Sequence, residues 1–235
     1  PVVPDNVRLL NLATHGVALD PSTGRTLWKS PGGKGGYSSP VVASINGRKT
    51  VVLFGEMDLY GVDFSTGKKL FSHPWQTKHN VNAADPIVMG KTIFIGSGYD
   101  RGCALVDVSS PTPSIIWENT NLRSHINSAV LLDGHLYGVD GNNGRGQFVC
   151  VNASTGVVKW TERLPFGSLI AADKLLVYFS ERGSLHVAKA SPSGYSEIAS
   201  AKTLLPRVCW TSPVLCNGQL YLRNSKGKLL CLNVK

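Results

Sequence analysis

Three arginines occur in short glycine-rich segments that are spaced about 40 residues apart along the chain. Arg101 lies in GSGYDRGC, Arg145 in DGNNGRGQ and Arg182 in SERGSL. Guanidinium groups bind carboxylates and phosphates through paired hydrogen bonds. A phosphate loop would need a helix after the glycines, because the helix N-terminus supplies N–H donors. A strand-like run follows each segment here. We therefore interpret the segments as open hairpin loops whose arginines form a positive arc that suits an acidic partner.

A second set of polar and aromatic residues stands just before short apolar runs. These residues are Tyr37, Asn82, His125, Asn127 and Trp210. Aromatic and amide groups around a concave opening suit a polar ligand or a peptide. The alternative is that these side chains cap strands and fill the opening without binding a ligand.

The sequence contains no pattern that predicts a catalytic centre or a metal site. The six histidines lack the spacings HExxH and HxH, and no GxSxG elbow occurs. The five cysteines include no CxxC pair. Cys150 and Cys231 occupy equivalent strands of different repeats, too far apart for a disulfide. We interpret the cysteines as buried free thiols, and we predict no catalytic residue and no metal ligand.

The charge of the chain is positive but dispersed. The formal net charge is +9, and the 24 lysines and arginines form no run longer than two. Scattered charge of this kind is typical of a solvated surface, so nucleic-acid binding is not expected. No apolar run reaches the roughly 18 residues that a transmembrane helix needs.

Four segments of the chain repeat one pattern, which is an apolar run, Asp or Asn, a short turn and a final aromatic. The segments are VALDPSTGRTLW, YGVDFSTGKKLF, ALVDVSSPTPSIIW and VCVNASTGVVKW. Their final aromatics are Trp28, Phe71, Trp117 and Trp160, at successive spacings of 43, 46 and 43. A small residue followed by an apolar pair recurs with the same period, at positions 40, 86, 129, 169 and 213.

Each period holds four short strand-like runs. In one period the runs are Ala129–Leu132, His135–Val139, Phe148–Asn152 and Val157–Thr161, with breaks at 133–134, 141–146 and 154–156. Four-stranded antiparallel units at this period predict propeller blades, with no helix longer than two turns. The final aromatics are expected to fill the wedge between adjacent blades, where burial of each contributes roughly 1.5–3 kcal/mol.

These residues resemble the pyrroloquinoline-quinone-type propeller repeat, apolar-x-Asp-x-x-Thr-Gly-x-x-x-Trp. The resemblance is carried by Asp20, Thr23, Gly24 and Trp28, and it covers nearly the whole chain. It implies an all-β propeller of four-stranded antiparallel blades, as a single domain over residues 1–235. The repeats fall near 7–30, 37–73, 80–119, 125–162, 166–204 and 209–235.

The first and last repeats are each one strand short, which gives about five and a half blades. An eight-bladed ring would need roughly two and a half more. We therefore expect part of such a ring, with the first and last blades exposing apolar faces.

The resemblance also supplies two functional hypotheses. Quinoprotein dehydrogenases hold pyrroloquinoline quinone with calcium through a carboxylate and an Asn, use a catalytic Asp, and often carry adjacent cysteines. This chain has no adjacent cysteines, and no converging Glu, Asn and Asp can be assigned. The first hypothesis is thus a non-catalytic scaffold, without cofactor, that binds a protein or other polymer through its rim and axial mouth. The alternative is a quinone-dependent oxidoreductase with active residues partly in further blades.

The resemblance extends to exported repeat proteins of bacteria, and more distantly to the propeller lipoprotein of outer-membrane assembly. It implies an exported protein, in the periplasm or at the cell surface.

Overall fold

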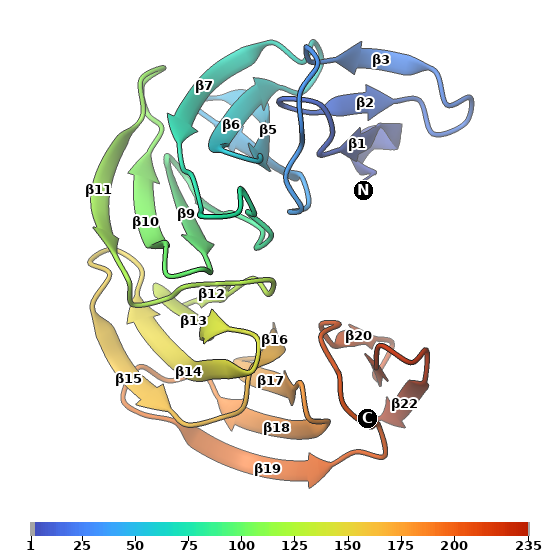
Figure 1. Cartoon of the computed structure of the whole chain (residues 1–235), viewed down its shortest axis with the longest axis vertical. Helices are drawn as coiled ribbons and strands as arrows, with labels where there is room; N and C mark the ends of the chain where they lie inside the picture. The colour runs from blue at the N-terminus through green and yellow to red at the C-terminus, as the bar shows by residue number, and fades with distance from the viewer. Residues whose placement is uncertain (1–2, 235) are drawn as a thin grey trace. The chain divides into compact units, whose positions relative to one another are not determined.

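The computed structural model describes residues 3–234, which form antiparallel sheets of three or four strands (Figure 1). One 3-10 turn, η1 (Pro4–Asn6), precedes the first strand, and residues 3–234 contain no α-helix. The chain separates into two compact units, residues 1–120 and 121–235, and each is described by itself. The expected all-β fold of blade-like sheets is confirmed, and the expectation of a single domain stays a prediction.

The first unit holds three sheets in which consecutive strands pair antiparallel. The three-stranded sheet is β1 (Arg8–Leu10), β2 (Val17–Leu19) and β3 (Thr26–Lys29). The second sheet is β4 (Val41–Ile45), β5 (Arg48–Phe54), β6 (Asp58–Asp63) and β7 (Lys69–Pro74). The third is β8 (Ile87–Met89), β9 (Thr92–Ser97), β10 (Gly102–Asp107) and β11 (Ser114–Asn119).

The second unit repeats this organisation with two complete sheets and one of three strands. The first is β12 (Val130–Leu132), β13 (His135–Asn142), β14 (Arg145–Asn152) and β15 (Val158–Glu162). The second is β16 (Gly167–Ala172), β17 (Leu175–Ser180), β18 (Ser184–Lys189) and β19 (Ser196–Lys202). The last is β20 (Val214–Cys216), β21 (Gln219–Arg223) and β22 (Leu229–Asn233).

The repeated Asp-x-x-Thr-Gly sequence forms the turn between the third and fourth strands of a sheet. Oδ1 of Asp63 accepts hydrogen bonds from the N–H groups of Ser65 and Thr66 and from the Thr66 hydroxyl. The Gly67 N–H then donates to the Asp63 carbonyl at 2.9 Å, with Gly67 at φ +70°. A short side-chain acceptor begins such a turn, and glycine adopts positive φ at little cost. The turn at Asn152 has the same hydrogen bonds, and the turn at Asp20 differs only in that the hydroxyl donor is Ser22.

The register slips once between the third and fourth strands of every four-stranded sheet. In the three-stranded first sheet, the slip lies between β2 and β3. In three of these sheets the slip directly follows a small residue that faces the repeated aromatic. These pairs are Ala18 with Trp28, Gly61 with Phe71, and Cys150 with Trp160. A bulge bends and twists the strand locally. The small residue leaves room for the ring, since a Cβ on Gly61 would lie 2.1 Å from Phe71.

The repeated tryptophans join one sheet to the next. Trp28 is buried among residues of β5 and β6, and its Nε1–H donates to the Phe64 carbonyl at 2.8 Å. A Cβ on Gly67 would lie 2.5 Å from the Trp28 ring, so the glycine of one turn admits the tryptophan of the preceding sheet. Trp160 likewise donates from Nε1 to the Ser191 carbonyl of the following sheet at 2.7 Å. The expected wedge between blades is confirmed for both tryptophans.

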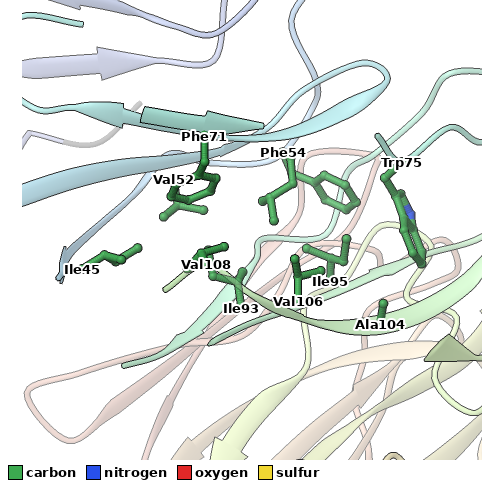
Figure 2. Close-up of a cluster of buried hydrophobic side chains, with 11 residues drawn as sticks. Ile45, Val52, Phe54, Phe71, Trp75, Ile93, Ile95, Ala104, Val106 and Val108 are labelled. Atoms are coloured by element: carbon green, nitrogen blue, oxygen red, sulfur yellow. The ribbon is translucent and has the colours of Figure 1, made fainter. Parts of the chain in front are cut away.

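Phe71 lies in the core between β4–β7 and β8–β11 (Figure 2). Figure 2 shows Phe71, Ile45 and Val108 at one end of this cluster and Trp75 at the other. Phe71 therefore also fills the space between two sheets, as predicted. Trp117 is half-buried, and its ring lies 6.0 Å from that of Phe94 in its own sheet.

The expectation of an open loop over residues 141–146 is wrong. Strands β13 and β14 extend through this segment and pair Gly141 with Gly146 and Asn142 with Arg145, which leaves a two-residue turn. The strands approach so closely that a Cβ on Gly141 would lie 2.4 Å from the Arg145 carbonyl oxygen. The glycines thus permit a tight hairpin and not an open loop.

The contact between Trp28 and Gly67 predicts unequal effects of two matched substitutions. Gly24→Ala places a side chain at φ +72° in open space, whereas Gly67→Ala does so at φ +70° against the indole. The first should lower the free energy of unfolding by about 1 kcal/mol, through backbone strain alone. The second should lower it by a further 1–3 kcal/mol, roughly, because the junction becomes overpacked. Urea unfolding followed by tryptophan fluorescence measures both, and equal losses would contradict the junction described above.

Candidate functional site

The candidate site is the end of each unit where second-to-third-strand hairpins meet the segments that lead into the next sheet. Antiparallel pairing brings these two kinds of segment to the same end of a sheet. Backbone hydrogen bonds join them, from the Trp75 N–H to the Met57 carbonyl in the first unit and from the Cys209 N–H to the Glu181 carbonyl in the second. This loop end, in each unit, contains all the binding residues predicted from the sequence.

In the first unit, Asn82 is fully buried and links three segments of backbone. Its Nδ2 donates to the carbonyls of Gly55, Glu56 and Trp75, at 3.0, 3.2 and 3.1 Å. Its Oδ1 accepts from the Ser97 hydroxyl at 2.7 Å. Buried amides need such partners. Asn82 therefore stabilises the loops, in agreement with the strand-capping alternative.

Arg101 is already occupied by neighbours in its own unit. Its guanidinium stacks 3.6 Å above the Trp75 ring, and Nη1 lies 2.6 Å from Oε1 of Glu118. A cation that faces both an aromatic ring and a carboxylate has little charge left for a ligand. Tyr37 differs from Arg101, because its side chain is 74% exposed.

In the second unit, His125 and Asn127 are buried and connect neighbouring segments. Nδ2 of Asn127 donates to the Gly167 carbonyl at 2.7 Å, and Nδ1 of His125 accepts from the Asn143 N–H at 3.3 Å. Burial lowers the pKa of His125, so the neutral, accepting form of the ring is favoured. Both residues position loops, as Asn82 does in the first unit.

An ion pair that the sequence analysis missed fixes the segment before β12. Nε and Nη2 of Arg123 donate to the two carboxylate oxygens of Asp140, at 2.9 and 2.7 Å. The Arg123 N–H also donates to Asp140, and its carbonyl accepts from the Gly141 N–H. This two-pronged geometry is the strongest that arginine offers a carboxylate. The signal in the sequence was Asp140, a charged residue directly after the expected strand His135–Val139.

Glu181 is a second buried carboxylate at the loop end of the second unit, and the sequence analysis also missed it. It is 1% exposed, and its Oε1 lies 3.3 Å from Nη2 of Arg207. Nε1 of Trp210 donates to its other oxygen at 3.4 Å. Trp210 is 42% exposed, so Glu181 orients an indole whose face remains available to a partner.

Arg182 and the unpredicted Arg163 line one open cavity of about 410 Å³, together with Gly146, Gln147, Leu164 and Pro165. Both arginines are exposed, and no ion pair is recorded for either among residues 3–234. Arg145 is also exposed and directly precedes the cavity residue Gly146. The acidic residues next to them in sequence are engaged elsewhere, because Glu162 accepts a hydrogen bond from the backbone N–H of Arg163 and Glu181 pairs with Arg207. The cavity can therefore attract an anionic group.

No group of three or more His, Cys, Asp or Glu residues that could hold a metal occurs within residues 3–234. All five cysteines are free thiols. The expectation that they are all buried is wrong for Cys216 and Cys231, which lie exposed in the three-stranded last sheet. Within the same residues, no helix is long and apolar enough to cross a membrane.

One protein family matches the sequence over residues 1–162, and its description is outer membrane protein assembly factor BamB. The chain belongs to this family. No curated protein matches the sequence. BamB from Moraxella catarrhalis has a similar solved structure, 15% identical, with TM-score 0.57 over 96% of this chain and 81% of that one.

The fold of the BamB family recurs in proteins of different function. A europium-containing methanol dehydrogenase is 12% identical, with TM-score 0.65 over 87% of this chain and 50% of that one. A chain of a mitotic checkpoint complex is 15% identical, with TM-score 0.73 over 97% of this chain and 71% of that one. Identities this low show a shared fold alone.

The hydrogen bonds of Asn82 predict that an isosteric acid is poorly tolerated at this position. Asn82→Asp would direct a carboxylate oxygen at three carbonyls, and should lower the free energy of unfolding at pH 7 by about 2–4 kcal/mol. The introduced carboxyl should have a raised pKa in the folded state. The loss should therefore shrink as the pH falls, because the protonated acid can donate again.

Asn80→Asp is the matched control, because Oδ1 of Asn80 accepts a hydrogen bond from Gln76, and a carboxylate preserves this role. Urea unfolding at pH 7 and pH 4.5 measures both variants. A pH-independent loss for Asn82→Asp would contradict the assigned donor geometry.

Proposed function

We propose that this chain is a non-catalytic scaffold that binds an acidic segment of a protein partner at the loop end of its second unit. One observation carries the proposal. Arg163 and Arg182 line the same cavity, and neither forms an ion pair with a carboxylate of residues 3–234. Arginine suits this role because its planar fork binds carboxylates at two points. The formal net charge of +9 would also accelerate the approach of an acidic partner.

Exposed aromatic side chains supply the second element of a protein-binding surface. Trp210, held by Glu181, lies at the loop end of the second unit, and Tyr37 lies at that of the first. Tryptophan, tyrosine and arginine are the residues most enriched among those that dominate binding energy. Each unit thus has one exposed aromatic side chain at its own loop end.

Membership of the BamB family supports the proposal at a coarser level. The family description names outer membrane protein assembly, and assembly requires contacts between proteins. We accordingly propose that the chain acts outside the cytoplasm, in the periplasm or at the outer membrane. A reporter fusion to the complete gene, scored for export, tests this location.

A charge-reversal experiment tests the acidic-partner proposal with a labelled decapeptide of glutamate as the probe. The chain should bind the peptide at low salt, and Arg163→Glu with Arg182→Glu should weaken binding at least tenfold, a change of about 1.4 kcal/mol. Lys174→Glu with Lys189→Glu changes the net charge equally, at exposed sites of the second unit that lie at the end of the β16–β19 sheet opposite to Arg182. This control should weaken binding much less.

Fluorescence anisotropy measures the peptide affinity at low and at physiological salt. Binding through these exposed arginines should fall with added salt, because counterions screen the attraction. Equal losses in both double variants would show attraction by net charge alone, and would reject the cavity as the site.

The quinone hypothesis makes a separate prediction. If the chain were part of a quinone-dependent oxidoreductase, pyrroloquinoline quinone with calcium should bind it and shift the quinone absorbance in a stoichiometric manner. Under the scaffold proposal, the absorbance of the quinone should remain that of the free compound. Titration of the chain, with and without calcium, distinguishes the two hypotheses.

A further inference from the structure

At one junction between sheets within the first unit, the repeated aromatic is a phenylalanine. Trp28 and Trp160 each donate an indole N–H to a carbonyl in the next sheet, namely those of Phe64 and Ser191. Both carbonyls belong to the turn after the third strand. Phe71 occupies the equivalent position at the junction of β4–β7 with β8–β11, and it has neither the N–H nor the second ring.

The chain replaces the missing indole N–H with an amide. Nδ2 of Asn46, in the β4–β5 turn, donates to the carbonyls of Val108 and Ser109 at 3.2 and 3.1 Å. These carbonyls follow β10, as the Phe64 carbonyl follows β6. The polar half of the tryptophan contact is therefore supplied by a different residue of the same sheet as Phe71.

The apolar half of the contact is not replaced, and a cavity of about 250 Å³ that is partly open to solvent is present there. The buried residues Phe71, Ile45 and Val108 line it on the apolar side. Its remaining lining includes the polar residues Asn46 and Thr50, and Ser110 and Pro111 of the next turn. At the Trp28 junction, the indole covers the turn at Gly67.

The mouth of this cavity is cationic. Arg48 lines it, is exposed, and has no ion pair recorded among residues 3–234. Asp63 is close enough to interact with Arg48 electrostatically. Hydrogen bonds from Thr66 and Ser65 lower the pKa of Asp63, and the positive charge of Arg48 makes a smaller contribution in the same direction. Those hydrogen bonds hold Asp63 in its turn. Arg48 thus remains available to a second anion.

We propose that this cavity, the Phe71 cavity, binds a small planar aromatic acid. The ring, of about indole size, occupies the space that tryptophan fills at the other junctions, and the carboxylate pairs with Arg48. The proposal is independent of the acidic-partner site, which lies in the other unit. Three junctions in the chain are equivalent, and two of them are filled by an indole while the third has a cavity beside a phenyl ring.

The test uses the full 235-residue chain, labelled with ¹⁵N, and two probes, indole-3-acetate and indole. Both should cause saturable amide shifts at Arg48, Thr50 and Ser110, with dissociation constants on the order of 1 mM or tighter. Indole-3-acetate should bind several-fold more tightly than indole. Arg48→Gln should remove that difference while it leaves the affinity for indole unchanged.

Two variants fill the cavity. Phe71→Trp should abolish binding of both probes, because its own second ring takes the site. Ser110→Trp fills the same space from an exposed turn, and serves if Pro111 prevents the first variant from folding. Trp28→Phe does the reverse, since it should open a second cavity over Gly67 and add a second indole site with shifts at the Gly67 amide.

Two kinds of result would contradict the proposal or a part of it. Absence of saturable shifts at the three cavity amides, or undiminished binding in both folded filling variants, would overturn the proposal. Equal affinity of Arg48→Gln and the parent chain for indole-3-acetate would overturn the assignment of an acid as the ligand. Loss of peptide binding to the second unit would leave these results unchanged, so this proposal and the acidic-partner proposal fail separately.

Discussion

The contact of an indole with a glycine turn in the next sheet is the interaction on which the rest of this structure depends. Trp28 packs over Gly67 and donates to the adjacent Phe64 carbonyl, so one residue provides both apolar burial and a directed hydrogen bond. Such burial contributes roughly 2–3 kcal/mol, and the hydrogen bond fixes the orientation of the ring. A single small sheet is marginally stable in water. Together with the Trp160 and Phe71 contacts, the Trp28 contact joins such sheets into units that bury a common core.

The junctions, in turn, set the positions of the loops at the end of each unit. Because each sheet is held against its neighbour, the segments that connect sheets can be short. One buried polar side chain is then enough to hold such a segment in place. Asn82 does this in the first unit with three carbonyl acceptors, and Asp140 does it in the second with Arg123. Loops held in this way expose a few side chains in fixed positions. Trp210 is an example, since its indole N–H is bound by a buried Glu181.

Variation among the junctions is as informative as their similarity. Where the aromatic is Phe71, the turn in the next sheet lacks the Thr-Gly sequence and contains Ser110 and Pro111. The polar contact is preserved there by Asn46, but the ring volume is not, and a cavity is present. Close packing is the rule in protein interiors, and a cavity at a repeated position marks a departure from the repeat. The same repeat that builds the core can thus provide a binding site.

The sequence by itself determined the repeat, the all-β sheets and the turns, because these depend on local chemistry. Asp63 and Gly67 lie within one turn, and the short acceptor and the positive φ they provide can be recognised without tertiary structure. The strand runs were predicted within a few residues, except at Gly141–Gly146, where close approach of two strands replaced the expected loop. Local sequence cannot show how closely two strands approach.

The candidate site was decided mainly by the tertiary structure, because charge and exposure depend on neighbours that are distant in sequence. Arg101 and Arg182 have similar sequence surroundings, yet Arg101 is covered by Trp75 and Glu118 while Arg182 shares an open cavity with Arg163. Asn82 and Trp210 were both predicted at the opening, and only the packing shows that the first is buried and the second exposed. Periodicity fixes which residues recur, but the contacts of each recurring residue are set by the sheet beside it.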